Sequence, residues 1–540
     1  MIFLSLLILI VAVALPSINK NINSILYIRI TSIIFIYSGA LSLNALYIQS
    51  IGSGIGIYSG LFHVTTISQL LDIIIFTIGS LILISWPKLN TEIVNDLNIL
   101  TNYRKHNCYN YVCEYSLIVL FSSFGASLLV SSADLISVYL SIELQSFAVY
   151  ILSTLYRDSE SSTSAGLKYF LLGGFSSCLI LLGCGLIYSF TGLTNLESIY
   201  SFVSVSDSNN IIQAISLGIL FIFLGFLFKI AAAPLHNWAP DVYDDTPTIV
   251  TIWLTIMPKI SIIIFLLELH TQLGIIGNNL NISELVGVPL INNLITDNIT
   301  NLITNLLLIS SLISLIIGTI VGLAQSRIKR LLAYSTISHI GFMLLALAIN
   351  TEQSIDSLIF YIIQYSITNL NTFLIILGFG YIINNSSLTR YYGKQETRKD
   401  IKYISELKGQ FFANPLLSIA LTICLFSMAG IPPLIGFFSK QFVLYSAIQS
   451  GYYFMAIVAI VVSVISASYY LKIIRVLHSE NDTKIFNYNI KMNSCEFTQD
   501  LTNYHSYLIS TLTLSILLFV LKPSILLNST QLLSLSLFNF

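Results

Sequence analysis

Long apolar runs recur along nearly the whole chain of 540 residues, and short polar stretches separate them. An α-helix needs about 20 mostly apolar residues to cross a bilayer. Because about fourteen runs reach that length, the pattern predicts an all-α polytopic membrane protein with about fourteen transmembrane helices. We expect the crossings at 1–18, 23–48, 66–86, 114–132, 134–155, 165–191, 211–240, 247–270, 301–323, 329–349, 355–384, 412–450, 452–476 and 506–525.

Prolines interrupt two of these runs. The seventh reads FIFLGFLFKIAAAPLHNW and contains Pro234, and the twelfth is too long for one straight crossing and contains MAGIPPLIGFFSK. Proline removes a backbone hydrogen bond and bends or breaks a helix. We therefore expect broken helices in spans 7 and 12, with a simple packing kink at Pro234 as the alternative.

The two interrupted runs share the pattern F-x-[IM]-A-x-x-P-x and lie five crossings apart. An odd separation gives them opposite orientations in the membrane, as in transporters built from inverted repeats. We predict two inverted five-helix repeats, within 114–270 and 301–476, although apolar segments can also match by chance. The remaining parts would be a three-helix segment at 1–113, a polar loop at 271–300, and a loop with a C-terminal transmembrane helix at 477–540.

Composition supports the membrane class and limits the chemistry. The chain is 55% hydrophobic and 9% charged, whereas soluble domains carry about 25% charged residues. A formal net charge of -1 offers no basic surface for nucleic acid. The six cysteines show no spacing typical of iron–sulfur, haem or zinc sites. We therefore expect this chain to bind no metal and no redox cofactor, so that electrons in any redox process travel elsewhere.

Loop charge predicts the orientation of the chain. Basic residues gather in loops that fall on one face, which the positive-inside rule assigns to the cytoplasm or matrix. These residues are Lys88, Arg104, Lys105, Arg157, Arg327, Lys329, Arg330, Arg390, Lys394, Arg398, Lys399, Lys402 and Lys408. The start, MIFLSLLILIVAVALPSINK, lacks the basic region of a secretory signal, so we expect it to be the first membrane helix.

Four ionisable residues lie near the middle of predicted crossings, namely Glu143, Lys229, Lys259 and Lys440. Any one of them alone could reach the membrane surface or form a structural ion pair. Three buried lysines, however, cannot be neutralised by one glutamate. Internal water or partly neutral amines would have to compensate, and both produce groups that accept and release protons. The set therefore predicts a proton relay.

His339, in AYSTISHIGFMLLALAI, is a further candidate. An imidazole in mid-membrane suits proton transfer near neutral pH. A histidine that is only hydrogen-bonded to Ser or Tyr is the competing interpretation.

Three long motifs carry a resemblance to a known family. KIAAAPLHNWAPDVYDDTPTIVT, RIKRLLAYSTISHIGFMLLAL and FSMAGIPPLIGFFSKQFVLYSA resemble signatures of the antiporter-like subunits of respiratory complex I and of multi-subunit sodium/proton antiporters. The resemblance covers most of the chain and is best from about 114 to 476. One departure is Ala239, which stands where the family motif has leucine, while the polar positions around it are kept.

The resemblance implies a role for each buried charge along a polar axis at the membrane midplane. Glu143 would modulate the charge of Lys229, Lys259 would carry the proton centrally, and Lys440 would be the terminal donor or acceptor. His339 lies in a matching motif with a less defined role. Chain 4 relatives typically have glutamate at the position of Lys440. Chain 5 relatives add a long lateral helix, for which the residues after the last expected crossing leave no room.

The family implies a proton-translocating membrane-arm subunit in the mitochondrial inner membrane, of a fungal type. NADH, FMN, iron–sulfur clusters and ubiquinone would belong to other parts of the enzyme complex, so this chain would have no redox active site. Expected partners are other membrane-arm subunits including chains 4 and 4L, accessory subunits and lipids. A subunit of a stand-alone cation/proton antiporter is the alternative, and a scaffold with a vestigial polar axis is a third possibility.

Overall fold

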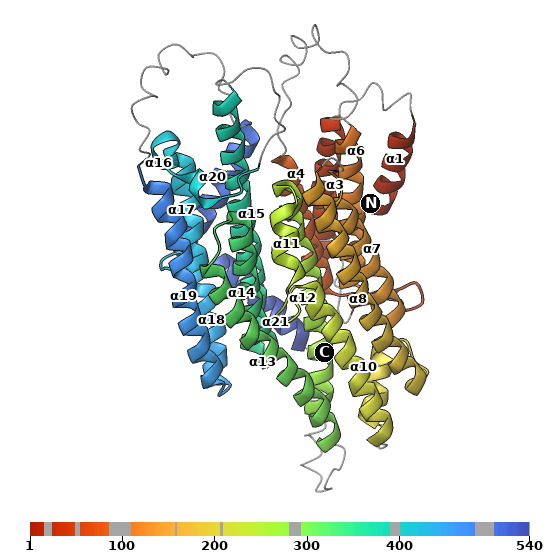
Figure 1. The fold of residues 1–540 in the computed structure, drawn as a ribbon. Helices are drawn as coiled ribbons and strands as arrows, with labels where there is room; N and C mark the ends of the chain where they lie inside the picture. The colour runs from red at the N-terminus through yellow and green to blue at the C-terminus, as the bar shows by residue number, and fades with distance from the viewer. Residues whose placement is uncertain are drawn as a thin grey trace, which may run out of the picture.

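The structure, a computed structural model, describes residues 1–15, 24–48, 54–85, 110–156, 159–205, 209–279, 293–388, 400–480 and 502–538. These residues form a bundle of helices that run mostly side by side (Figure 1). Among them, 10 helices are long and apolar enough to cross a membrane, and further apolar helices are shorter. The all-helical membrane fold is therefore confirmed, whereas the count of about fourteen crossings stays a prediction.

The N-terminal part contains helices and a small hairpin. The hairpin is antiparallel, and its second strand is tied to Ser131, the residue directly after Asn110–Val130 (α6), by a hydrogen bond from the His63 amide to the Ser131 carbonyl at 2.7 Å. Thr65 and Ser68 form a capping box at the start of the following helix. The elements are α1 (Ile2–Ala14), α3 (Ser24–Ile48), β1 (Ile55–Ile57), β2 (Phe62–Val64) and α4 (Thr66–Ile84).

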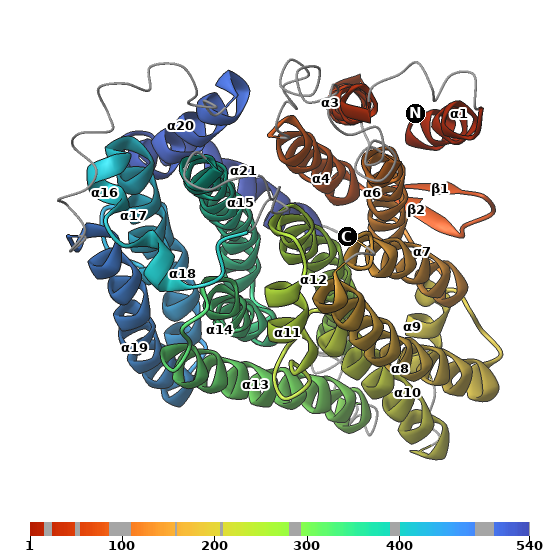
Figure 2. The same cartoon turned by 45° about the horizontal axis from the view of Figure 1, so that its top comes forward.

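The next part of the chain contains the first interrupted helix. Its long helices pack as neighbours, with α8 beside α10 and α6 beside α7 (Figure 2). The elements are α6 (Asn110–Val130), α7 (Leu135–Ser153), α8 (Glu160–Thr191), α9 (Leu196–Val205), α10 (Asn209–Lys229), α11 (Trp238–Asp245) and α12 (Thr248–Asn279).

The second half of the chain contains the second interrupted helix and ends with α21, which packs against α15 and reaches α4 (Figure 2). The elements are α13 (Asn293–Leu323), α14 (Ile328–Ile349), α15 (Glu352–Leu388), η2 (Ile404–Leu407), α16 (Gln410–Ala413), α17 (Pro415–Ala429), α18 (Ile435–Gln449), α19 (Tyr453–His478), α20 (Asn503–Leu518), η3 (Phe519–Leu521) and α21 (Ser524–Phe538).

Helices α12 and α14 form the centre of the bundle. In the most apolar stretch of α12, 94% of residues are buried, and in that of α14, 100% are buried. Helix α8, at the edge, has only 33% buried in the same sense, which leaves an apolar surface for lipid or other chains. Polar side chains on α12 and α14 are therefore enclosed by protein, where each needs a partner.

The predicted boundaries agree with the structure for the strongly apolar runs and fail elsewhere. The two interruptions lie inside the predicted spans 211–240 and 412–450, between α10 and α11 and between α17 and α18. The polar loop predicted at 271–300 is shorter, because α12 continues to Asn279 and α13 begins at Asn293. The β1–β2 hairpin and α21 were not predicted, since neither has a spanning apolar run.

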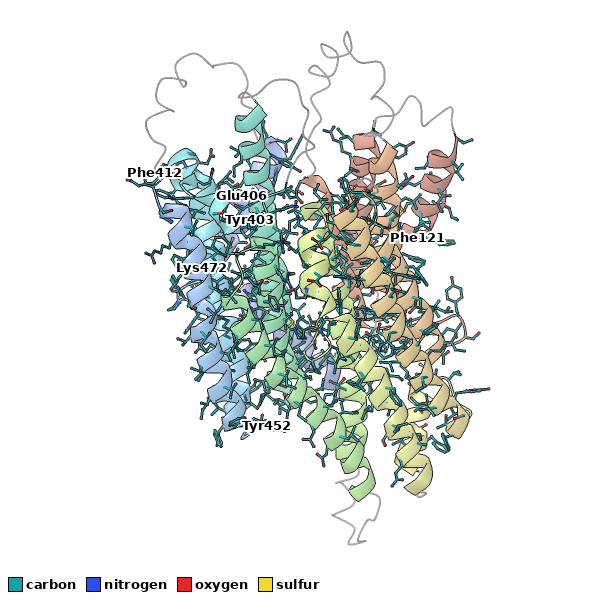
Figure 3. All side chains as sticks on the ribbon, in the orientation of Figure 1. Phe121, Tyr403, Glu406, Phe412, Tyr452 and Lys472 are labelled. Carbon is teal, nitrogen blue, oxygen red and sulfur yellow. The ribbon has the colours of Figure 1, made fainter. Side chains whose placement is uncertain are left out.

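Part of the predicted basic face can be located. Arg327 bridges to Tyr403, and Tyr403 and Glu406 lie toward the end of the bundle opposite Tyr452 (Figure 3). Lys329 and Arg330 follow Arg327 closely in sequence, and the described loop residues Lys402 and Lys408 lie on either side of Tyr403 and Glu406. The others, Lys88, Arg104, Lys105, Arg157, Arg390, Lys394, Arg398 and Lys399, lie outside the described residues.

Candidate functional site

The first pair of predicted site residues is in contact. Lys229, at the last position of α10, forms an ion pair with Glu143 of α7, with Nζ 3.3 Å from the carboxylate oxygen. Their side chains are 7% and 14% exposed, so the pair is buried. The Ser146 hydroxyl donates to the Glu143 backbone carbonyl at 3.1 Å, one helical turn further along α7. The geometry gives Lys229 one carboxylate and places the pair between two helices.

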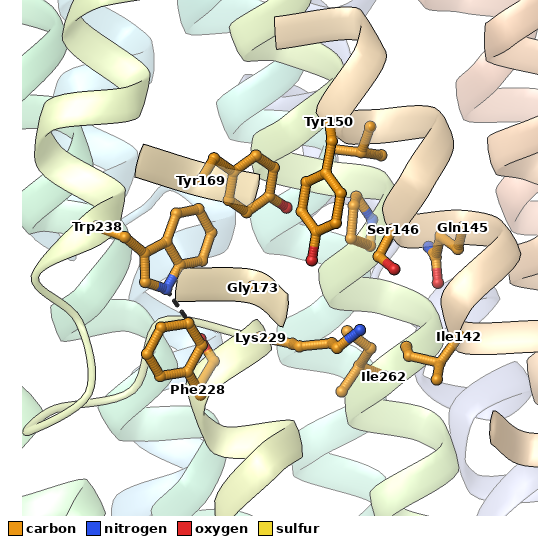
Figure 4. Close-up of a pocket in the computed structure, with 12 residues that line it drawn as sticks. Ile142, Gln145, Ser146, Tyr150, Tyr169, Gly173, Phe228, Lys229, Trp238 and Ile262 are labelled. Carbon is orange, nitrogen blue, oxygen red and sulfur yellow. Dashed lines mark hydrogen bonds between the residues drawn. The ribbon is translucent and has the colours of Figure 1, made fainter. Parts of the chain in front are cut away.

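The helix break beside Lys229 is closed by hydrogen bonds. The backbone turns left-handed at Ala231 (φ 63°), and the Ala232 amide donates to the Leu227 carbonyl at 2.9 Å. The Trp238 indole donates to the Phe228 carbonyl at 3.0 Å (Figure 4). A helix end leaves such carbonyls without internal partners. Because the chain supplies them, the break is an ordered turn that fixes Lys229 at the end of α10.

A small cavity lies against the Lys229 side chain (Figure 4). Its volume of about 20 Å³ is enough for a water molecule. Polar groups of the lining can bind such a water, and aromatic rings close the other side. The lining residues are Ile142, Gln145, Ser146, Val149, Tyr150, Tyr169, Gly173, Phe228, Lys229, Trp238, Pro258 and Ile262.

A polar link joins the helix of Glu143 to the helix of Lys259. The Gln145 amide on α7 donates to the Ser261 hydroxyl at 3.0 Å, and the amide oxygen of Gln145 lies 3.2 Å from the same hydroxyl. Ser261 also donates to the carbonyl of Pro258, the proline inside α12. Both side chains are buried. Gln145 and Ser261 therefore provide the polar contact between the Glu143 and Lys259 helices.

Lys259 is 2% exposed and forms no ion pair with any described carboxylate. Its Nζ donates to the Tyr365 hydroxyl on α15 at 3.3 Å. The amine also lies 5.4 Å from the ring centre of Tyr243 and 5.8 Å from that of Tyr365. Ring faces and one hydroxyl stabilise an ammonium far less than a carboxylate does. Lys259 is thus enclosed by aromatic groups, without a fixed counter-charge.

His339 lies between two tyrosines. Its Nδ1 is 2.7 Å from the Tyr361 hydroxyl and its Nε2 is 3.3 Å from the Tyr470 hydroxyl. A neutral imidazole has one donor and one acceptor nitrogen, and hydroxyl groups can serve both. The ring of Tyr365, the partner of Lys259, is centred 5.9 Å from the His339 ring. His339 is thus hydrogen-bonded to tyrosines next to the Lys259 site, and this geometry fits both the proton-transfer interpretation and the competing one.

Lys440 occupies the second helix break. It lies on α18 and reaches back to α17, where Nζ donates to the carbonyls of Met428 and Ala429, both at 2.9 Å. Helix carbonyl ends carry partial negative charge, so this position favours a cation. The amine is also 5.7 Å from the ring centre of Phe342, one turn after His339 on α14.

The predicted residues therefore form neighbouring contacts but not one continuous hydrogen-bonded line. Glu143 binds Lys229, Lys259 binds Tyr365, and His339 lies next to Tyr365. Among the described residues, no direct hydrogen bond joins Lys229 to Lys259, or His339 to Lys440. Water would be needed to complete these steps.

Several residues of the site were missed by sequence reasoning. Tyr361 and Tyr365 stand four residues apart in the apolar α15, so they share one helix face. That spacing was a usable signal. Gln145 follows Glu143 by two residues and was equally visible, whereas Tyr243 and Tyr470 gave no local signal because only packing brings them here.

Ion pairs connect the helices at the basic end of the bundle. Arg327 binds Asp244 at 2.6 Å and Lys329 binds Asp400 at 2.7 Å. Asp400 also accepts hydrogen bonds from the amide and hydroxyl of Thr248, the first residue of α12. Burial raises the pKa of Asp400, but Lys329 and the Thr248 hydrogen bonds outweigh it, so the pKa lies below the ordinary value of 3.8. This carboxylate joins the starts of α12 and α14.

The described residues contain no group of three or more His, Cys, Asp or Glu side chains placed to hold a metal ion. Cys178, Cys184 and Cys424 are free thiols.

Comparisons with known proteins agree with this fold. The family described as NADH:quinone oxidoreductase/Mrp antiporter, transmembrane, matches residues 132–288 and 282–466. The chain is 50% identical to NADH-ubiquinone oxidoreductase chain 2 of Rhizopus oryzae over the full length of both chains. It is 34% identical to the protein of the same name from Marchantia polymorpha, over 76% of this chain and 80% of that one. Both relatives are chain 2 subunits, which agrees with the lysine at position 440, where chain 4 subunits typically have glutamate.

Two solved structures share the fold. A chain of respiratory complex I from Thermus thermophilus with bound aureothin superposes with a TM-score of 0.68 at 23% identity, covering 98% of this chain and 99% of that chain. A chain of the Mrp complex from Dietzia sp. DQ12-45-1b gives a TM-score of 0.74 at 17% identity, covering 100% and 96%. With the family match over more than half of its length and a full-length relative at 50% identity, the chain belongs to the NADH:quinone oxidoreductase/Mrp antiporter family.

Proposed function

We propose that the chain is a proton-translocating membrane-arm subunit of respiratory complex I in the mitochondrial inner membrane. It would couple NADH:ubiquinone oxidoreduction, which takes place in other subunits, to proton transfer through Glu143, Lys229, Lys259, His339 and Lys440. The observation that carries the proposal is Lys259, a buried amine with no carboxylate partner in the described part of the chain, in a chain that closely matches chain 2 subunits. NADH, FMN, iron–sulfur clusters and ubiquinone would be bound by partner subunits, and chains 4 and 4L would be among the membrane-arm neighbours.

The proposed relay uses the different environments of the lysines. A charged Lys259 costs several kcal/mol more than a paired one, because burial removes its hydration and no carboxylate replaces it. A charged Lys229 is stabilised by Glu143 at 3.3 Å. Weakening the Glu143–Lys229 pair would therefore make Lys229 a proton donor, and Lys259 could accept through water near Gln145 and Ser261. His339 and its tyrosines would carry the proton from Lys259 toward Lys440.

We further propose that the two interrupted helices mark two inverted five-helix repeats in a chain of about fourteen crossings. Both interruptions place a left-handed residue shortly after the helix end, Ala231 in one and Gly430 in the other, and the two are offset by one position in the shared pattern. In both, a side chain from beyond the break binds the freed carbonyls. This likeness in detail supports a common origin for the two units.

The test of the relay is Lys259→Met in the assembled complex. Methionine keeps the length of the side chain but cannot carry a proton, so we expect NADH-linked proton pumping to fall at least about tenfold. Lys472→Met is the matched control, because Lys472 lies exposed on α19, away from the axis (Figure 3), and its Nζ donates to the Gln325 carbonyl at 3.4 Å. Normal pumping by an assembled Lys259→Met complex would refute the relay.

A stand-alone cation/proton antiporter subunit is the second candidate, and the likeness to the Mrp complex chain favours it. Such a subunit would have no redox partner. Purification of the tagged chain distinguishes the two: a flavin-containing peripheral arm and rotenone-sensitive NADH oxidation in the same particle support complex I. An isolated antiporter assembly without NADH oxidation supports the alternative.

A further inference from the structure

The far end of α12 contains buried polar groups that the relay above does not use. Helix α12 begins at Thr248, beside the ion pairs of the basic end, and carries Lys259 in its middle. Glu268 and His270 follow Lys259 by 9 and 11 residues. At a rise of about 1.5 Å per residue, they lie roughly 14 and 17 Å further along, toward the opposite end of the bundle.

His270 is 1% exposed, and neither of its ring nitrogens has a hydrogen-bond partner among the described residues. The ring of Phe223 packs edge-on against it at 6.5 Å. A neutral imidazole needs one acceptor and one donor, and leaving both unpaired in a buried place costs free energy. A water molecule can both donate and accept, so water can provide the hydrogen bonds that the His270 ring needs.

A second unpaired group lies against the same turn of α12. Asn350 ends α14 in a left-handed conformation (φ 51°), and its amide nitrogen lies 3.5 Å from the His270 carbonyl. The amide oxygen of Asn350 is buried and has no partner among the described residues. The end of the His339 helix, α14, therefore meets the His270 turn of the Lys259 helix, α12, at a place that offers unsatisfied donors and acceptors.

Glu268 adds an acid to this place. It is half-buried on α12 and faces α9, where Tyr200 is buried. Burial raises the pKa of the Tyr200 phenol, and the charges of Glu268 and of the exposed Glu197 raise it further. Glu268 thus lies two residues from His270 on α12 and near Tyr200 of α9.

An apolar stretch separates this place from Lys259. Residues 262–267 read IIIFLL, and all of them are buried. Such a stretch conducts protons only when water enters it, and it prevents leakage when it is dry.

We propose that Glu268, His270 and Asn350 hold a hydrated proton-transfer site through which Lys259 exchanges protons with the aqueous phase opposite the basic end. The inference rests on the proposed relay and adds its exit or entry route. When water fills the apolar stretch, the Lys259 ammonium gives a proton to this water and becomes a neutral amine. The proton passes to the Glu268 carboxylate, which becomes a carboxylic acid and then releases it to the outside water. His270 and Asn350 hold the waters.

The test compares Glu268→Gln with Glu268→Asp in the assembled complex. Glutamine keeps the size and polarity of the side chain but cannot carry the proton, so we expect the protons pumped per NADH to fall at least about twofold. Aspartate keeps the acid, so we expect more than half of the wild-type ratio. NADH oxidation by an artificial acceptor at the peripheral arm and the amount of assembled complex should be unchanged in both. A wild-type ratio in assembled Glu268→Gln would overturn the proposal.

A matched pair of histidine variants separates this site from general damage to the core. His270→Phe should lower the pumping ratio, whereas His505→Phe should not. His505 is equally buried, on α20, and has a protein partner in the Leu374 carbonyl at 3.0 Å. Equal losses in both variants would count against a specific role for His270. If Lys259→Met pumps normally, the relay itself fails. If Lys259→Met fails to pump but Glu268→Gln and His270→Phe pump normally, only the present inference fails.

A measurement on the unmodified complex decides the matter if the variants do not assemble. A cryo-EM map of the intact complex that resolves water should show density within hydrogen-bond distance of a His270 ring nitrogen and of the Asn350 amide oxygen. A protein or lipid group bound to both atoms, with no water, would overturn the proposal.

Discussion

The two interrupted helices look alike in backbone and differ in where the lysine stands. In the α10–α11 break, Lys229 is the last residue of the first half and binds the Glu143 carboxylate. In the α17–α18 break, Lys440 comes from the second half and binds two carbonyls of the first. The position that corresponds to Lys229 in the shared pattern is Ser427, whose buried hydroxyl has no partner among the described residues.

A broken helix can therefore hold a buried ammonium in two ways. At the first break an acid from another helix provides a full negative charge, which can itself change. At the second break the helix end provides partial charges that are fixed by the fold. The charge that stabilises Lys229 can therefore change, whereas the partial charges that stabilise Lys440 are fixed by the fold. This fits a control point at Lys229 and a terminal station at Lys440.

Glu143→Gln and Lys440→Met should have the largest effects of the substitutions that test this difference between the two breaks. Removing one partner of a buried pair leaves an uncompensated charge and costs about 3–5 kcal/mol. Lys440→Met strands no charge but leaves two carbonyls without a donor, at about 1–3 kcal/mol each, so its cost is of similar size. We expect proton pumping to be lost in both variants, and the thermal stability of the complex to fall in both. Glu160→Gln, at the exposed start of α8, is the control and should match wild type. A Glu143→Gln complex as stable as wild type would show that the pair does not stabilise the first break.

Substitutions at the two left-handed residues test how the backbone of each break contributes to stability. Gly430 has φ 88°, and a Cβ there would lie 3.0 Å from the Lys440 side chain. Gly430→Ala should therefore destabilise by roughly 1–2 kcal/mol and lower pumping through a displaced Lys440. Ala231 already has φ 63°. Ala231→Gly would relieve the strain of this conformation but would increase the entropy that the chain loses on folding, so stability should change by less than about 1 kcal/mol. Thermal unfolding of the purified complex measures both. Equal effects at the two sites would mean that the breaks are not equivalent in backbone.

The smallest expected effect concerns the ion pair that anchors the chain after the first break. Because the pKa of Asp400 lies below 3.8 in the folded protein, its contribution is fully present above that pH and is lost as the pH falls through the lowered pKa. Asp400→Asn should thus lower the melting temperature by a constant amount from pH 5 to 8. The cost should be smaller than at Glu143, because the Asp400 side chain is 34% exposed and partly screened and Lys329 keeps the Thr246 carbonyl as a partner. The two proteins should converge only below about pH 4. A difference that grows between pH 6 and 8 would assign the effect to another group.

Local sequence signals predicted part of this arrangement well. Apolar length placed α8, α14 and α19 within a few residues, and the prolines placed both interruptions. Lys229, Lys259 and Lys440 were recognisable because a charge inside an apolar run is expensive. The resemblance to the family then assigned each of them a role.

The contacts of the lysines were not predictable in the same way. Nothing in the residues around Lys440 indicates that it binds the carbonyls of Met428 and Ala429, because this depends on how α18 folds back on α17. The link from Gln145 to Ser261 spans 116 positions and follows from packing of α7 on α12. The aromatic surroundings of Lys259 come from α11 and α15 in the same way. Local periodicity carries no information on such pairings.

The Asp400 contact also bears on how the protein is made. Thr248 and Asp400 are 152 positions apart, so the start of α12 receives its carboxylate only after the second half of the chain has been synthesised. Until then the first amides of α12 and the Lys329 amine lack this partner. The helix that carries Lys259 therefore reaches its final fixed position late in biogenesis, and a chain truncated before residue 400 would leave it unanchored.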